Sequence, residues 1–406
     1  MRLTDHPTRS IIMSFNRRTF LKSSTLLGSA FGLGAFPALA HGVTIALNAD
    51  GVDERALMQQ PKPARKLSIL ILGGTGFIGP DQVRYAVDRG HDVTLFNRGQ
   101  TNPGLFPEVK KLVGDRNLPD GHDILKGKKY DVVIDNPTTL PQWVKGAGEA
   151  LKGNVGHYIF VSTISVFSDY TSPVDENGPL NAPGPMDVKI ENARAQYGPL
   201  KVRSEMEAKT QFGDNVTIVR PGLIVGPGDI TDRFSYWPVR IDKGGEIMAP
   251  GAPSDPVQYV DARDLSEWII RLAEGKVLGT FNATGPKTPT NIAEMLYGIK
   301  AVTTSDAHFT WVDADFLAAN RVQGWSDMPV WMAPRGRTSA FARINCSKAY
   351  AAGLTFRPLA ETAKDTLEWY HSRPAVEQEK AAAGIAPDKE KSVLAAWNAK
   401  KAAGAP

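Results

Sequence analysis

The chain has 406 residues, of which 42 % are hydrophobic, and its 47 basic and 43 acidic side chains leave a formal net charge of +4. So small an excess of positive charge offers no footprint for nucleic acid, and a single cysteine excludes an intramolecular disulfide. No cluster of histidines and cysteines has the spacing of a metal site, so we expect no bound metal. The length suffices for a two-part α/β domain with a substantial core.

The first forty residues have the features of an export signal. The Arg17-Arg18 pair, with Asn16 where a serine or threonine is usual, resembles the twin-arginine motif. A weakly apolar, glycine-rich stretch then ends in a small-x-small cleavage sequence at residues 38–40, and it is too short for a good membrane-spanning helix. We expect residues 1–40 to bring the folded chain to the twin-arginine export machinery, and so to the periplasm, and then to be removed, leaving no stable membrane span. A disordered basic tail on a cytoplasmic protein is the alternative.

A polar linker is expected at residues 41–65, and an apolar run then leads into three glycines spaced by three, Gly73, Gly76 and Gly79. Strand, glycine turn and helix together predict a dinucleotide-binding turn. Gly73 allows the tight turn, Gly76 lets the backbone approach a pyrophosphate, and Gly79 lets helix and strand pack closely. The phosphates would lie at the helix N-terminus, where free N–H groups and the helix dipole favour an anion. Further candidate cofactor contacts in this turn are Thr75, Phe77 and Ile78.

Short apolar runs alternate with helical segments as far as Arg220. This alternation indicates βαβ units, and hence a Rossmann-type doubly wound parallel sheet over residues 66–220. A ligand of such a sheet lies outside the carboxyl ends of the strands. The predicted strands are 67–72, 92–96, 130–134, 158–161 and 216–219, and the predicted helices between them are 77–88, 140–151 and 197–211.

The second predicted strand ends in Asn97 and Arg98. An acidic residue at this place would bind the 2′-hydroxyl of the adenosine ribose, whereas Arg98 suits a 2′-phosphate better. A solvated surface arginine is the alternative interpretation. The sequence therefore predicts NADP as the cofactor, contacted by both residues, with NAD as the alternative.

Two later segments carry groups suited to acid–base chemistry. The strand at 158–161 leads into hydroxyls that include Thr163, which could hydrogen-bond a substrate oxygen; a Ser/Thr turn closing the strand is the alternative. Tyr197 and Lys201 are four residues apart on a predicted helix, so phenol and ammonium share a face. The ammonium is expected to lower the pKa of the phenol from about 10. Taken alone, such a pair is usually an ordinary surface pair.

From residue 221 the chain becomes rich in glycine, proline and tryptophan, which predicts a smaller, loop-rich substrate lobe over 221–373 with interleaved elements of the sheet domain. Its predicted helices are 262–272 and 290–297. Residues 374–406 predict a polar, solvated helix or a flexible tail. Aromatic faces suit sugar rings and arginines suit phosphate or carboxylate groups, although ordinary packing is the alternative for each residue. The candidate substrate contacts are Arg233, Tyr236, Trp237, Arg240, Gln258 and Tyr259.

In this order, the segments resemble the extended branch of the short-chain dehydrogenase/reductase superfamily, the NAD-dependent epimerase/dehydratase type, over roughly residues 66–369. The three glycines match the cofactor turn of that branch. Thr163 matches its catalytic Ser/Thr, Tyr197 and Lys201 match its catalytic Tyr and Lys, and Asp115 matches its adenine-side acidic contact. Three further segments agree with the branch, at residues 220–229, 259–265 and 279–285.

The chain also departs from the pattern of that branch. Phe167 replaces a usual tyrosine, and Asp135 and Asn136 stand where small alanines often line the cofactor. The Asn-Arg-Gly segment at 97–99 resembles a chloroplast RNA-binding relative that keeps the fold but is not chiefly an enzyme. A non-enzymatic, Rossmann-type nucleotide-binding or sensor protein is therefore the alternative function.

The resemblance implies an NAD(P)-dependent epimerase, dehydratase or reductase that transfers a hydride on a sugar-like or small hydroxy or carbonyl substrate. Tyr197 would be the acid/base, Lys201 would hold the nicotinamide ribose, and Thr163 would position the substrate oxygen. Because no NAD(P) pool is obvious outside the cytoplasm, we expect a cofactor loaded before export and held tightly. A homodimer is one expected assembly.

Overall fold

The computed structural model describes residues 63–136, 139–378 and 382–404, all within the compact unit Lys62–Pro406. The predicted leader with Arg17 and Arg18, and the linker as far as residue 62, lie outside the described residues. Of the helices that the structure describes, none is long and apolar enough to cross a membrane.

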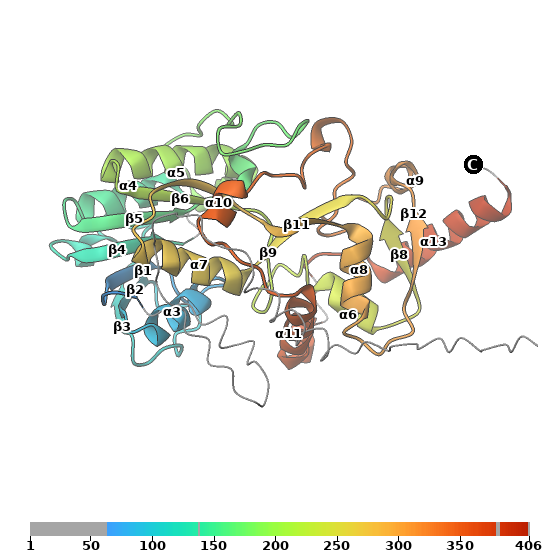
Figure 1. Ribbon diagram of the computed structural model, residues 1–406, viewed down its shortest axis with the longest axis horizontal. Helices are drawn as coiled ribbons and strands as arrows, with labels where there is room; N and C mark the ends of the chain where they lie inside the picture. Colours follow the sequence, from blue (N-terminus) through green and yellow to red (C-terminus); the bar gives the residue numbers. More distant parts are fainter. Residues whose placement is uncertain (1–62, 137–138, 379–381, 405–406) are drawn as a thin grey trace, which may run out of the picture. The chain divides into compact units, whose positions relative to one another are not determined.

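A seven-stranded sheet is the centre of the N-terminal part (Figure 1). All six strand pairs in it are parallel, and the strand order is β10-β6-β5-β4-β1-β2-β3. Strands are added on both sides of β1, which is the doubly wound order that the sequence predicts. The bounds are β1 Ser68–Leu72, β2 Asp92–Asn97, β3 Lys110–Val113, β4 Tyr130–Asp135, β5 Val155–Val161, β6 Val216–Pro221 and β10 Gly279–Ala283.

Helices cover both faces of this sheet, which explains why its strands are apolar throughout (Figure 1). Successive residues of β1 point to opposite faces: Ile69 and Ile71 pack on the side of α3 and α7, and Leu70 and Leu72 pack on the side of α4 and α5. All four side chains are fully buried. The helices are α3 Gly79–Asp88, α4 Pro141–Ala150, α5 Tyr197–Phe212 and α7 Ala262–Glu274. Two sheet-domain elements, α7 and β10, thus come from the part of the chain beyond residue 221.

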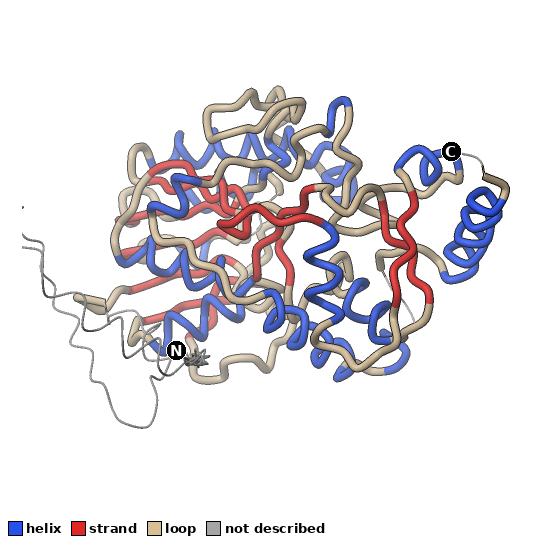
Figure 2. Tube along the Cα trace, turned by 45° about the vertical axis from the view of Figure 1, so that its right-hand side comes forward, coloured by secondary structure: helices blue, strands red, loops and turns tan. Residues whose placement is uncertain are grey.

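A second lobe contains two small sheets, of order β11-β9-β7 and β12-β8 (Figure 2). Its core includes Trp237, Met248, Leu296 and Trp331, each at most 2 % exposed. Its strands are β7 Ile224–Val225, β8 Glu246–Pro250, β9 Pro256–Asp261, β11 Gly285–Asn291 and β12 His308–Val312. The remaining helices are α6 Tyr236–Asp242, α8 Ile292–Lys300, α9 Ala314–Ala319, α10 Ser347–Ala351, α11 Leu359–Ser372, α12 Ala375–Gln378 and α13 Pro387–Ala402.

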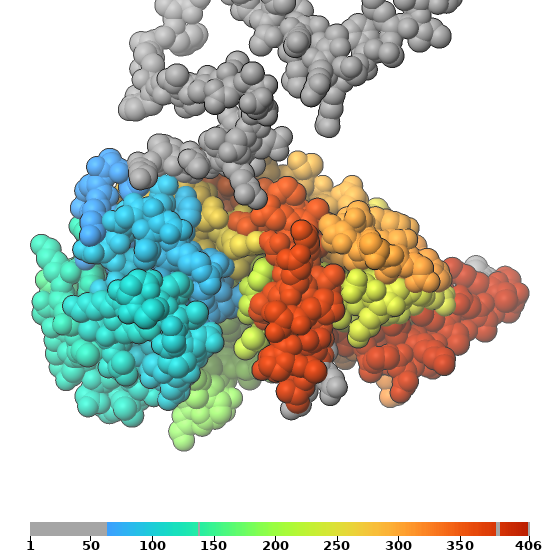
Figure 3. All heavy atoms as spheres, turned by 90° about the horizontal axis from the view of Figure 1, so that it is seen from below, coloured from blue at the N-terminus to red at the C-terminus, as the bar shows by residue number. Residues whose placement is uncertain are grey.

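Helix α11 connects the two parts of the molecule. Figure 3 shows this segment crossing the lower face between the blue-to-cyan sheet domain and the yellow-to-orange lobe. Its Asp365 pairs with Arg263 of α7, and its Thr362 hydroxyl donates to the Asp261 carboxylate at 2.7 Å. These contacts attach α11 to the end of β9, in the second lobe, and to the start of α7, in the sheet domain.

The C-terminal helix corrects one expectation. The sequence predicts a solvated or flexible segment over 374–406, but α13 buries Val393, Leu394 and Trp397 in the core of the second lobe. The Trp397 ring lies 4.8 Å from that of Phe316. The apolar positions of α13 are few and separated by lysines and alanines, so the buried stripe is inconspicuous in the sequence.

Candidate active site

The glycine turn has the geometry that close packing and ligand approach require. Gly73 and Gly74 have φ values of +108° and +89°, which favour glycine. A Cβ on Gly79 would lie 2.5 Å from the Cα of Gly74, so strand and helix can approach only because both residues are glycines. At Gly76 an added Cβ would meet nothing within 4 Å. The backbone at Gly76 is therefore open to a ligand.

Two asparagines hold this turn in place. The Asn97 side chain donates to the Gly73 carbonyl at 3.0 Å and accepts from the Gly99 N–H at 2.8 Å. Asn102, at φ +45°, donates to the Thr75 carbonyl at 3.0 Å. Asn97 is thus a structural support of the turn, and the sequence indicated only a cofactor contact.

A cavity of about 190 Å³ opens over the turn. It brings together six of the predicted cofactor residues: Gly73, Thr75, Gly76, Asn97, Arg98 and Asp115. Its wall also contains residues that the sequence did not indicate as cofactor contacts, among them Gln100, Thr101, Arg116, Asn136 and Trp143. Phe77 and Ile78 lie outside this wall; Ile78 is 3 % exposed and belongs to the apolar core, against which Phe77 packs.

These residues fit a dinucleotide. Helix α3 begins at the turn without a side chain capping its first N–H groups, which leaves them available to a phosphate. Arg98 is exposed at the rim, and Asp115 accepts hydrogen bonds from Asn117 at 3.0 and 2.9 Å. The cavity is open at Gly76, and its wall also carries the cationic Arg98 and the acidic Asp115.

Thr163 lies directly after β5, at its carboxyl end. Its side-chain oxygen accepts from the Ser165 N–H at 3.1 Å and so caps the short 3₁₀ turn Ile164–Val166. The same hydroxyl interacts with the Tyr197 phenol. Thr163 therefore has the structural role that the sequence gave as one alternative and also lies next to Tyr197, while its role toward a substrate stays a prediction.

Tyr197 is the first residue of α5, and Pro199 is accommodated in its first turn. The residue is 37 % exposed, yet the protein around its hydroxyl raises the pKa of Tyr197 by desolvation. The Thr163 hydroxyl and the positive charge of Arg233 act in the opposite direction. This corrects the expectation that Lys201 lowers the pKa of the phenol: desolvation raises that pKa, and the cation that partly opposes the increase is Arg233.

Lys201 is fully buried one turn further along α5. Its Nζ donates to the Val161 carbonyl at 2.7 Å and lies 6.0 Å from the centroid of the Tyr197 ring. Burial lowers the pKa of Lys201 to about 7, opposed by the negative charges of Asp135 and Glu205. Tyr197 and Lys201 thus share a helix face as predicted, but the ammonium points to the strand.

Of the predicted substrate residues, Arg233 lies near Tyr197, and the others pack in the protein or line another cavity. Arg233 lies within electrostatic range of Tyr197, with its guanidinium 5.9 Å from the centroid of the Trp325 ring. Trp237 is fully buried and donates its indole N–H to the Pro329 carbonyl, so it is a core residue. Gln258 uses both polar atoms of its side chain on the backbone of Ile344, at 3.1 and 2.8 Å.

Tyr259 is also mainly a packing residue. It is 9 % exposed and lies 5.8 Å, ring to ring, from Phe234. Burial raises its pKa. Of the six candidate substrate residues, only Arg233 interacts with the Tyr197 phenol.

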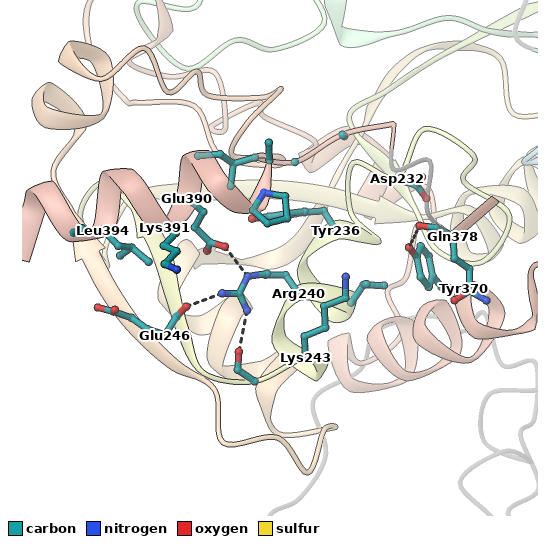
Figure 4. A pocket seen from close by; sticks show the side chains of 18 of the residues that line it. Asp232, Tyr236, Arg240, Lys243, Glu246, Tyr370, Gln378, Glu390, Lys391 and Leu394 are labelled. Atoms are coloured by element: carbon teal, nitrogen blue, oxygen red, sulfur yellow. Dashed lines mark hydrogen bonds and ion pairs between the residues drawn. The ribbon is translucent and has the colours of Figure 1, made fainter. Parts of the chain in front are cut away.

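Tyr236 and Arg240 belong to another cavity, of about 1040 Å³, between α6 and α13 (Figure 4). Arg240 donates to the Glu390 carboxylate at 2.8 Å and to the Gly244 and Glu246 carbonyls at 2.9 and 2.6 Å. Asp232 accepts from Arg373 at 3.2 Å. The residues that line this cavity include none of Thr163, Tyr197 and Lys201, so it is separate from the site around Tyr197.

Residues 69–283, more than half of the chain, match the family model described as the NAD dependent epimerase/dehydratase family. The chain belongs to this family.

Curated relatives of this epimerase/dehydratase-family chain have varied names. It is 27 % identical over 260 residues to the chloroplast stem-loop binding protein of 41 kDa b of Arabidopsis thaliana, covering 58 % of this chain and 65 % of that protein. It is 29 % identical over 226 residues to the 2-alkyl-3-oxoalkanoate reductase of Stenotrophomonas maltophilia, covering 50 % of this chain and 64 % of that protein. The chain thus spans slightly less than two thirds of both relatives.

Solved structures support the fold. A putative epimerase from Burkholderia cenocepacia superimposes with a TM-score of 0.55 at 17 % identity, covering 79 % of this chain and 100 % of that chain. The UDP-N-acetylglucosamine 4-epimerase from Bacillus cereus gives 0.54 at 16 % identity, covering 76 % and 98 %. The family's fold therefore extends well beyond the residues that its sequence model matches.

Proposed function

We propose that the chain is an NAD(P)-dependent oxidoreductase of the epimerase, dehydratase or reductase type, acting on a sugar-like or small hydroxy or carbonyl substrate. The observation that carries the proposal is the convergence of Thr163 and Arg233 on the Tyr197 phenol, with Lys201 in the next turn of the same helix. Relatives named as reductases agree with this class of reaction.

Different residues would bind the cofactor, transfer the proton and position the substrate. The glycine turn, Arg98 and Asp115 would hold the dinucleotide, and Lys201 would donate to its nicotinamide ribose. A bound nicotinamide supplies the hydride acceptor or donor. When a substrate alcohol loses its C–H hydride, the Tyr197 phenolate takes the hydroxyl proton; in the reverse reaction the phenol returns it to the carbonyl oxygen. Thr163 positions that oxygen, and the charge of Arg233 favours the phenolate.

The cofactor we propose is NADP, because exposed Arg98 lies at the cavity rim where a 2′-phosphate would extend. We further propose that the Arg17-Arg18 leader exports the folded chain to the periplasm with this nucleotide already bound. The absence of any possible intramolecular disulfide agrees with folding in the cytoplasm. A nucleotide regenerated within each catalytic cycle would serve such a protein.

The test measures both the retention of bound nucleotide and the rate of the reaction. We expect Tyr197→Phe to retain nucleotide but to convert a panel of sugars, hydroxy acids and ketones at least about a hundredfold more slowly than wild type, with conversion followed by NMR of the substrate as well as by the nicotinamide absorbance. Tyr297→Phe, on the exposed face of α8, is the matched control and should behave as wild type. Mass spectrometry of mature protein from the periplasmic fraction should identify NADP(H).

Three outcomes would count against these proposals. Wild-type rates in Tyr197→Phe would remove the tyrosine from the mechanism. Nucleotide binding without conversion of any substrate by wild type would favour the alternative function, a non-enzymatic nucleotide-binding or sensor protein. A periplasmic protein that carries only NAD(H), or none, would contradict the cofactor proposal.

A further inference from the structure

Asp135, which stands where the family often has a small residue, is the centre of a buried charge network. It ends β4 and is fully buried. Arg116 binds both of its carboxylate oxygens, at 2.7 and 2.9 Å, and the Tyr158 hydroxyl donates to it at 2.5 Å. A bidentate guanidinium and a hydroxyl donor favour the ionised carboxylate. The carboxyl end of β4 therefore carries a buried, ionised carboxylate, that of Asp135.

The catalytic lysine lies next to this charge. Asp135 is opposite Phe160 in the register of β4 and β5, and parallel strands lie roughly 4.8 Å apart. The Lys201 Nζ lies 4.9 Å from the centroid of the Phe160 ring and donates to the adjacent Val161 carbonyl. A fully buried ammonium is costly unless charges or dipoles compensate it. Asp135 is placed to supply that compensation from the neighbouring strand.

A second carboxylate approaches the lysine from its own helix. Glu205 follows Lys201 by one turn of α5, and Arg220 of β6 binds it at 2.9 and 2.7 Å. The Ser162 hydroxyl also donates to Glu205, at 2.6 Å. Both carboxylates raise the pKa of Lys201 against the desolvation that lowers it, Asp135 more strongly than Glu205. The buried lysine is thus flanked by two Arg–carboxylate pairs.

The Arg116–Asp135 pair also reaches the nucleotide cavity. Arg116 lines the cavity beside Asp115, and its guanidinium lies 5.2 Å from the centroid of the Trp143 ring. The guanidinium also donates to the backbone carbonyl of Trp143 at 3.1 Å. One ion pair therefore connects the cavity wall beside Asp115 with the lysine one turn from Tyr197.

We infer that Asp135, held in place by Arg116 and Tyr158, is a positioning residue that keeps the Lys201 ammonium charged for nucleotide binding. This inference rests on the proposed nucleotide site. Its consequence is that nucleotide affinity decreases as Lys201 loses its proton, and that loss of the Asp135 charge moves the decrease to lower pH.

The test is the affinity for NADPH, measured by fluorescence titration across the pH range on either side of neutrality. In wild type we expect affinity to fall with increasing pH around a midpoint of about 7. Asp135→Asn should move that midpoint down by about one pH unit or more, so that binding near neutrality weakens about tenfold. In Lys201→Met the pH dependence should disappear. Asp131→Asn, also on β4 but partly exposed and paired with Arg65, is the matched control.

A second variant guards against misfolding. Asp135→Asn leaves Arg116 without its buried counter-ion, whereas replacing both partners, Arg116→Met with Asp135→Leu, removes the charge and keeps the space filled. The midpoint is the readout, because it is insensitive to a uniform loss of affinity through Arg116. Folded variants with the wild-type midpoint would overturn the inference. If wild type itself bound neither NADPH nor NADH, the proposed function would fail instead.

Discussion

Gly76 and Gly79 are three residues apart in the same turn, yet the structure gives them different physical roles. Gly79 allows the start of α3 to lie against Gly74, with no room for a methyl group. Gly76 leaves an open direction from the backbone into the nucleotide cavity. Gly79 thus serves the fold, and Gly76 leaves the backbone open where we propose that the nucleotide binds.

The two glycines should respond oppositely to alanine. Gly79→Ala pushes a Cβ into backbone that cannot move easily, so we expect a loss of about 2–3 kcal/mol in the free energy of unfolding. Gly76→Ala should unfold like wild type in urea but bind NADPH at least about tenfold more weakly, because its methyl group would occupy the phosphate approach. Equal stability of the two variants, or full NADPH affinity in Gly76→Ala, would contradict these roles.

The polar residues of the site illustrate what a motif leaves open. The spacing of Tyr197 and Lys201 correctly places both on one face of α5. Which cation reaches the phenol depends instead on the loop before α6, where Arg233 is steadied by the Thr231 hydroxyl at 2.8 Å and by the Trp325 ring. No local pattern in the sequence relates residue 233 to residue 197.

Helix α13 shows the same limit for a whole element. Its composition is that of a solvated helix, and its buried residues are recognisable only from their partners in the lobe. Glu390 accepts from Arg240 at 2.8 Å and from the Met248 N–H at 3.1 Å, which ties α13 to α6 and β8. The helix is therefore part of the core of the lobe.

Removing the largest buried side chain of α13 should weaken the lobe. Trp397 is 8 % exposed and packs on Phe316, so we expect Trp397→Ala to lower the free energy of unfolding by about 3 kcal/mol. Ser392→Ala on the exposed face of the same helix is the control and should change it by less than about 0.5 kcal/mol. Urea unfolding measures both. Similar curves for Trp397→Ala and wild type would show that α13 contributes no stability.

For the whole molecule, two buried histidines set a dependence of stability on acid. Burial lowers the pKa of both His122 and His157 to about 4, helped at His122 by the charge of Arg116 and at His157 by that of Lys276. The unfolded chain takes up these protons near 6.5. Between the two values the unfolded state binds more protons, so stability falls as the pH decreases from about 6.5 towards 4.

A histidine variant isolates this effect. Between neutral pH and pH 5, each histidine should lower the free energy of unfolding by roughly 2 kcal/mol. On the same acidification, the decrease in His157→Gln should therefore be smaller than in wild type by about this amount. Asp264, whose pKa burial raises to about 6, acts in the opposite direction, but it is common to both proteins and cancels in the difference. Denaturant unfolding at both pH values measures the loss. An identical loss in the variant would exclude His157 as a source.

The sequence by itself determined five of the seven strands and the four covering helices of the sheet domain, because these depend on periodicity and spacing within short segments. It also predicted the glycine turn and singled out Thr163, Tyr197 and Lys201, but β3 and β10 were not among its predicted strands. The tertiary structure decided which charges from other elements surround those residues, since Arg233 lies before α6 and Asp135 ends β4. It also moved Trp237 into the core and gave α13 its buried face. Burial and long-range electrostatics depend on how distant segments pack, and a linear pattern carries that information only weakly.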